Sequence, residues 1–159
     1  MTPVLFFSRL RTYLKTMAWV AAPQGKIFGD SVYIVSKIPI EQIAAYRPPV
    51  AFIVDGGAAI DNNHPGLIQQ SFSISIFVQN VQDHMGESVM LGANRAAGTS
   101  EGAGLLDIEE EMINQIIDVT VLTTKVMLVE KGLPSATVAR GNNPAVFRTI
   151  KFSVLLSLY

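Results

Sequence analysis

The first segment of the chain places apolar and polar residues at helical spacing. Thr2 and Pro3 form a typical helix start, a capping residue followed by proline at the first helical position. At about 100° per residue, one side of the segment is polar and includes Arg9, Arg11 and Lys15. The other side is apolar and consists of Phe6, Phe7, Leu10, Tyr13, Leu14, Met17 and Ala18. The pattern predicts an amphipathic helix that ends at the turn of residues 23–25.

Two residues fall on the polar side of this helix although they are apolar. They are Leu5 and Trp19, the only tryptophan of the chain. A scattered apolar residue on a surface is ordinary. For Trp19, contact with a partner protein and packing on a neighbouring loop both stay open.

Period-two alternation predicts two strands. In "QQSFSISIFVQN" (69–80), Phe72, Ile74, Ile76 and Val78 alternate with serines, and "FRTIKFSVLLSLY" (147–159) alternates in the same way. Further extended segments are expected at 26–36, 50–57 and 122–130, with a short helix at 38–46. Turns are expected after Asp55 at its two glycines, at 61–66, at 132–134 and at 141–144.

A Gly- and Ala-rich segment at about 83–104 has no sustained period and is too long for an ordinary connection, so we expect a functional arm or a partly disordered segment. The next segment, "LLDIEEEMINQIID" (105–118), predicts a strongly amphipathic helix. Glu109 falls inside its apolar arc, where a lone carboxylate costs free energy unless it is paired. Its expected partner is a basic residue of the same fold or of an adjacent copy; Glu110 and Glu111 are expected on a solvated face.

These elements predict a single α+β domain over residues 1–159. We expect a mainly antiparallel sheet with an N-terminal helix and a second amphipathic helix packed on it, and the long arm besides. The chain has 159 residues, 49% of them hydrophobic, which is enough for one sizeable core. It has no cysteine, which removes disulfides and thiolate chemistry, and no apolar run near the ~20 residues of a membrane span.

Charge is segregated along the chain despite a net charge of −1. Residues 1–47 carry six basic and two acidic side chains (+4), residues 48–118 one basic and ten acidic (−9), and residues 119–159 five basic and one acidic (+4). Acidic and basic faces meet either between neighbouring copies or within one fold.

Candidate catalytic chemistry is weak. "GTSEG" (98–102) fits the G-x-S-x-G pattern of a nucleophile elbow, but no strand precedes Ser100, and both His64 and His84 lie upstream of it. Asp61 with His64, or Asp83 with His84, supplies only two ligands of a metal site. No phosphate-binding loop is complete. We therefore predict no enzyme activity, no cofactor and no metal.

An ordered series of motifs carries a resemblance. "RPPVAFIVDGG", "HPGLIQQSFSISIFV", "DHMGESVMLGANR" and "GAGLLDIEEEM", over roughly residues 45–118, together resemble the tail-terminator (tail-completion) proteins of long-tailed bacteriophages. The resemblance implies a structural virion protein that forms a homohexameric ring on the end of the tail tube. Such a ring stops further tube-protein addition and offers a joining surface to the connector of the head. It implies no catalytic residues.

What the resemblance implies about partners follows. We expect self-association, binding to the tail tube protein and to the head–tail connector (stopper) protein, passage of DNA through the lumen without sequence recognition, and no membrane binding. The expected location is the tail or neck of the virion, assembled in the host cytoplasm. Interface candidates are Asn94 and Arg95 in the arm, Glu109, and Leu5, Arg9, Arg11, Lys15 and Trp19 of the first helix. The alternatives are a head-side neck protein and, less favoured, a small hydrolase that uses Ser100.

Overall fold

The computed structural model describes residues 1–21, 23, 25–79, 104–117, 122–132, 136–140 and 143–158, and only the backbone of 136–140 and 143–144. Within these residues the elements are two α-helices, α1 (Pro3–Thr16) and α3 (Leu105–Ile117), one 3-10 helix and six strands. The 3-10 helix η1 spans Ile40–Ala45, and the strands are β1 (Val32–Val35), β2 (Val50–Ile60), β3 (Leu67–Val78), β4 (Val126–Glu130), β5 (Ala136–Arg140) and β6 (Asn143–Ser157). The predicted α+β class is confirmed.

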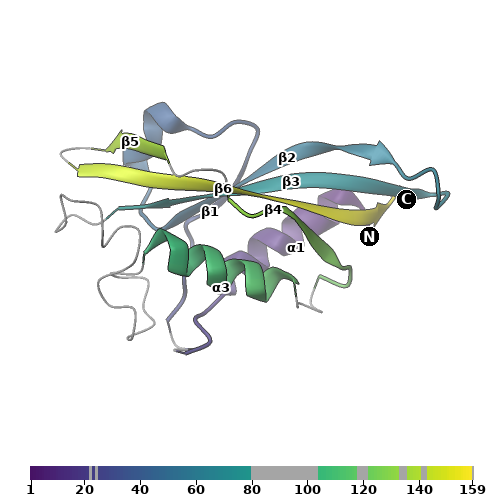
Figure 1. Ribbon diagram of the computed structural model, residues 1–159, viewed down its shortest axis with the longest axis horizontal. Helices are drawn as coiled ribbons and strands as arrows, with labels where there is room; N and C mark the ends of the chain where they lie inside the picture. Colours follow the sequence, from purple (N-terminus) through teal and green to yellow (C-terminus); the bar gives the residue numbers. More distant parts are fainter. Residues whose placement is uncertain are drawn as a thin grey trace.

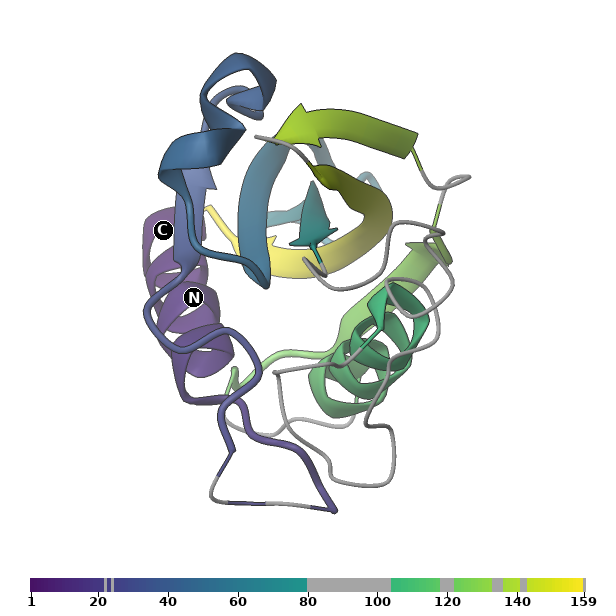
Figure 2. The same cartoon turned by 90° about the vertical axis from the view of Figure 1, so that its left-hand side faces the viewer.

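The six strands form one mixed sheet in the order β1-β2-β3-β6-β4, with β5 also paired to β6. β1 and β2 are parallel and are joined through η1, whereas every other pair is antiparallel. The sheet is strongly curled, so that at one end β5 approaches η1 (Figure 2). Both chain ends lie at the opposite end (Figure 1), where Ser157 N–H donates to Met1 O at 3.0 Å.

The main core lies between one face of the sheet and the two helices. α1 contributes Phe6, Leu10 and Leu14, all fully buried, because these residues share one side of the helix. The sheet contributes alternate residues, as the period of two requires: from β3, they are Phe72, Ile74, Ile76 and Val78. α3 contributes Leu105, Ile108, Met112, Ile113 and Ile116. The core face predicted for residues 72–78 is confirmed.

A smaller apolar cluster lies on the other face of the sheet, at the curled end. Its buried members are Ile43, Val50, Phe52, Phe77 and Ala145. The rings of Phe77 and Phe147 stack at 4.8 Å between centroids. The predicted face of serines is therefore only partly solvated, since Ser75 is buried and its Oγ lies 2.7 Å from Oγ1 of Thr149.

The first helix is shorter than predicted. It ends at Thr16, and the following residues turn back on themselves: Ile27 N–H donates to Met17 O, and Trp19 N–H donates to Gly25 O. A longer helix would place Trp19 on the solvent side, whereas leaving the helix lets this large side chain enter the core at 7% exposure. Burial of a tryptophan outweighs three further helical residues.

The second strand is longer than predicted. The glycines after Asp55 do not end it: Gly56 and Gly57 form a β-bulge, and pairing with β3 resumes at Ala58. Gly57 has φ +86°, and its N–H donates to Oδ1 of Asp55 at 2.7 Å. Gln70 Nε2 donates to the same oxygen at 2.7 Å, so the Asp-Gly-Gly sequence serves a bulge inside a hairpin.

Two strand predictions also need correction. The segment 26–36, expected as a strand or extended chain, is a strand only over Val32–Val35, because residues 26–27 instead close the turn after α1. Residues 136–140, expected within a bend, form β5, which pairs with the start of β6. That region reads as two turns from sequence because Gly132, Pro134 and Gly141 flank a strand of only five residues.

A candidate assembly surface

Glu109 has its partner inside the fold. Its side chain is 1% exposed, and its Oε2 lies 2.7 Å from Nε of Arg148 on β6. The contact is an ion pair without hydrogen-bond geometry, since neither Nε of Arg148 nor either Glu109 oxygen makes a hydrogen bond within the described chain. Of the two partners that the sequence left open, the structure supplies the intramolecular one. A direct contact of Glu109 with a second copy stays a prediction that its burial disfavours.

Gly132 leaves room for the guanidinium of Arg148. A Cβ built on Gly132 would overlap Nε of Arg148, and the glycine has φ +55°, a conformation that side-chain-bearing residues adopt at a cost. Glycine at position 132 therefore leaves the space that Arg148 needs to reach Glu109.

α1 presents a basic surface to solvent. Its sequence contains Arg9, Arg11 and Lys15 and no acidic residue, and Arg9 and Arg11 are exposed. Arg9 Nη1 donates to Oγ1 of Thr123 at 3.3 Å, and Nζ of Lys15 lies 3.8 Å from the fully exposed Asp30. Exposed pairs at such distances contribute little stability, so these charges remain available to a partner.

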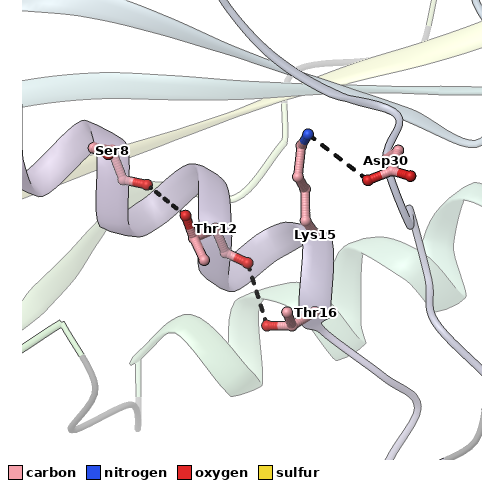
Figure 3. A network of polar contacts seen from close by, with 5 residues as sticks. All are labelled: Ser8, Thr12, Lys15, Thr16 and Asp30. Atoms are coloured by element: carbon pink, nitrogen blue, oxygen red, sulfur yellow. Dashed lines mark hydrogen bonds and ion pairs between the residues drawn. The ribbon is translucent and has the colours of Figure 1, made fainter.

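Hydroxyl groups line the same side of α1. Thr12 Oγ1 donates to Ser8 O at 3.1 Å and Thr16 Oγ1 to Thr12 O at 3.2 Å, beside the Lys15–Asp30 pair (Figure 3). Leu5 is 44% exposed. The exposed residues along this helix are thus polar, and Leu5 adds an apolar residue near its start. Such a mixed surface suits a protein contact.

Trp19 does not belong to this surface. It is 7% exposed and packs in the main core, so of its two readings the structure supports packing within the chain. It lies three residues beyond the end of α1.

α3 presents the opposite charge. It contains Asp107, Glu109, Glu110 and Glu111 and no basic residue, and Glu110 is exposed. Glu111 was expected on a solvated face, but its Oε1 accepts from Val20 N–H at 2.8 Å and from Gln115 Nε2 at 2.7 Å. Gln115 Nε2 also lies 2.7 Å from Ala18 O, so this face of α3 anchors the turn that follows α1.

The two histidine-containing candidates for metal ligation have different outcomes. Nδ1 of His64 lies 2.7 Å from Oδ2 of Asp61 in the exposed turn between β2 and β3. Hydrogen bonds from His64 and from the N–H of Asn63 hold the pKa of Asp61 below its usual value. Among the described residues, no group of three His, Asp or Glu side chains is placed to hold a metal ion. Asp83 and His84 lie outside the described residues, as do Asn94, Arg95 and Ser100.

None of the helices in the described ranges is long and apolar enough to cross a membrane.

Comparison with known proteins adds no family to this picture. The chain matches no protein-family model and, at a significant level, no curated protein.

Proposed function

We propose that this protein is a tail terminator of a long-tailed bacteriophage, a structural protein that caps the completed tail tube as a ring. In this role it stops the addition of tube protein and provides the surface that the head connector joins. Its partners are further copies of itself, the tube protein and the connector, and DNA passes through its lumen without being read.

The observation that carries this proposal is the lateral polarity of the helical layer. α1 packs beside β1 at one side of the sheet, and α3 packs on β4, β3 and β6, toward the other side (Figure 2). α1 exposes the basic residues Arg9 and Arg11, and α3 exposes the acidic residue Glu110. Two different surfaces of opposite charge on one molecule favour head-to-tail association, which closes into a ring where the rotation permits. Together with the motif series at 45–118, this polarity supports the terminator role.

The test is electron microscopy of the purified protein, alone and mixed with isolated tail tubes. Rings, or caps seated on tube ends, are the expected result. Small single particles that ignore the tubes contradict the proposal, and binding of the same particles to isolated heads instead assigns the protein to the head side of the neck. A Ser100→Ala variant that still completes tails dismisses the hydrolase alternative.

A further inference from the structure

The two ends of the sheet differ in how their edges are closed. At the curled end the strands run β1-β2-β3-β6-β5, and β5 approaches η1, which follows β1. At the other end they run β2-β3-β6-β4, because β1 pairs only as far as Val54 and β4 pairs with residues 151–154 of β6. There, β2 is one outer strand and β4 is the other.

The open edge of β2 comprises Asp55–Ile60. Within the part of the chain that the structure describes, this segment pairs with β3 on one side and with no strand on the other. Its interior is Gly-Gly-Ala-Ala, and Ile60 at its end is 72% exposed. Proteins usually protect an edge with lysine or proline, and this edge has neither. A bulge is its one protective feature.

The open edge of β4 comprises Val126–Glu130. Among the described residues it pairs with β6 alone, and Met127 and Val129 are 38% and 62% exposed. It lies level with the open edge of β2, because the registers join Val126 through Val154 and Gln70 to Ala58. The two open edges are therefore the opposite sides of one four-stranded band.

On both open edges, alternate residues direct their backbone N–H and C=O groups outward, where a further strand could pair with them. Asp61 N–H donates to Leu67 O, and alternation along β2 then directs the N–H and C=O of Ala58 and Ile60 away from β3. When the same alternation is followed across the registers of β3 and β6, it directs the backbone N–H and C=O of Val126 and Leu128 away from β6. β2 and β4 run in opposite directions, since three antiparallel pairings separate them.

Charge at the ends of the edges is complementary as well. Acidic residues, Asp55 and Asp61, begin and follow the open edge of β2. Lysines, Lys125 and Lys131, flank that of β4, whose last residue, Glu130, is paired with Lys151 of β6. Each pair is six residues apart, and each intervening segment contains one bulge. Antiparallel pairing that sets Asp61 beside Lys125 also sets Asp55 beside Lys131. It places the outward groups of Ala58 opposite Leu128 and those of Ile60 opposite Val126.

We propose that the open edge of β2 in one copy adds to the open edge of β4 in a second copy, in this register. The proposal rests on the proposed function, in that the band of strands would then continue around the ring. Pairing of like edges, β2 with β2 or β4 with β4, would bring carboxylates together or ammonium groups together, and opposite-charge pairs are the favourable ones. In this register Val126 pairs with Ile60 of the second copy, two residues beyond Ala58, with which Val126 is level in its own sheet. Closure of a sheet requires such a stagger.

Cysteine cross-linking tests the register directly, because the chain has no cysteine of its own. In the proposed seam Ala59 and Met127 are opposite each other, and neither directs its backbone groups across the seam. Such pairs are the closer kind, with Cα atoms about 4.5 Å apart, which suits a disulfide. Mild oxidation of the Ala59→Cys/Met127→Cys variant is expected to give a ladder of covalent oligomers on a non-reducing gel.

The single variants are the matched controls. Each alone should stay monomeric on the gel, and an equal mixture of the two should give cross-linked dimers and nothing larger. Cross-linking of either single variant alone would show pairing of like edges and overturn the proposal. A second measurement uses Lys125→Glu/Lys131→Glu, which should shift the assembly to monomers in size-exclusion chromatography, against a Lys37→Glu control that should not.

Failure of this inference and failure of the proposed function are distinguishable. Rings that cap tubes but give no ladder overturn the β2–β4 seam and leave the terminator role standing. A ladder without rings or tube binding supports the seam and contradicts the terminator role. Monomers that give neither overturn both.

Discussion

Nε of Arg148 lies 2.7 Å from Oε2 of Glu109, and this contact joins the last strand to the buried side of α3. Removal of one partner leaves the other charge in a largely apolar site. We expect Glu109→Ala to lower the free energy of unfolding by about 3 kcal/mol. Urea unfolding followed by circular dichroism, at one protein concentration, measures the change.

A double variant distinguishes the loss of the ion pair from the cost of leaving one buried charge unpaired. Glu109→Leu/Arg148→Met leaves no unpaired charge, so we expect it to recover most of the stability that Glu109→Ala loses. A double variant as unstable as the single one would mean that packing around α3, and not the uncompensated arginine, sets the cost.

Gly132→Ala should be more destabilising than its backbone conformation alone explains. Alanine at a positive φ costs roughly 1–2 kcal/mol. At position 132 the new methyl group must also displace the guanidinium of Arg148. Gly29→Ala is the control, since Gly29 has φ +57° and nothing lies within 4 Å of its Cβ position. Equal thermal shifts for the two variants would show that Arg148 yields without cost.

The sequence predicted the helices and long strands because their apolar residues recur at one period over many residues. α3 and the core face of β3 are examples. What it missed depends on single tertiary contacts. Burial of Trp19 ends α1 early, and the hydrogen bond from Gln70 to Asp55 turns a glycine pair into a bulge. Neither contact leaves a period in the sequence.

The sequence does contain a signal for the partner of Glu109. Arg148 shares the parity of Ile150 and Phe152 in an alternating strand, which places its side chain toward the core. A charge at an inward position requires a partner of opposite sign, and Glu109 is the one acid in an apolar arc. The open edges were beyond sequence reasoning, because they follow from where β1 and β4 stop pairing.

Tyr13 connects α1 to α3, since its hydroxyl donates to Gln115 O at 3.2 Å. We expect Tyr13→Phe to cost about 1 kcal/mol of unfolding free energy. Burial raises the pKa of Tyr13, so the fold favours the neutral phenol. Its contribution is complete below pH about 10 and is lost as the pH rises further. The wild-type protein should therefore lose stability at high pH more steeply than Tyr13→Phe, as thermal unfolding at pH 8 and pH 11 would reveal.

The turn at Asp61 should respond to acid. The pKa of Asp61 is lowered in the fold, chiefly by the hydrogen bond from His64, so the carboxylate stabilises the turn above its unfolded pKa of about 4. That contribution declines as the pH falls below this value. In His64→Ala we expect the Asp61 pKa to rise, as an NMR titration of its carboxyl carbon would record. An unchanged midpoint would assign the lowering to the Asn63 N–H instead.

The basic side of α1 gives a test of assembly that leaves the fold intact. Arg9 and Arg11 are exposed, and the hydrogen bond from Arg9 to Thr123 is exposed and 3.3 Å long. Arg9→Glu/Arg11→Glu should therefore change the free energy of unfolding by no more than about 0.5 kcal/mol.

The effect of this variant on assembly should be larger. If α1 of one copy faces the acidic α3 of the next, the variant should weaken ring formation at low salt by repulsion. In about 0.5 M salt the difference in ring formation between variant and wild type should become smaller. Lys37→Glu/Arg47→Glu changes the net charge equally at exposed positions on either side of η1, outside both α-helices, so it should assemble normally. Equal loss of assembly in both variants would attribute the effect to net charge and not to this helix.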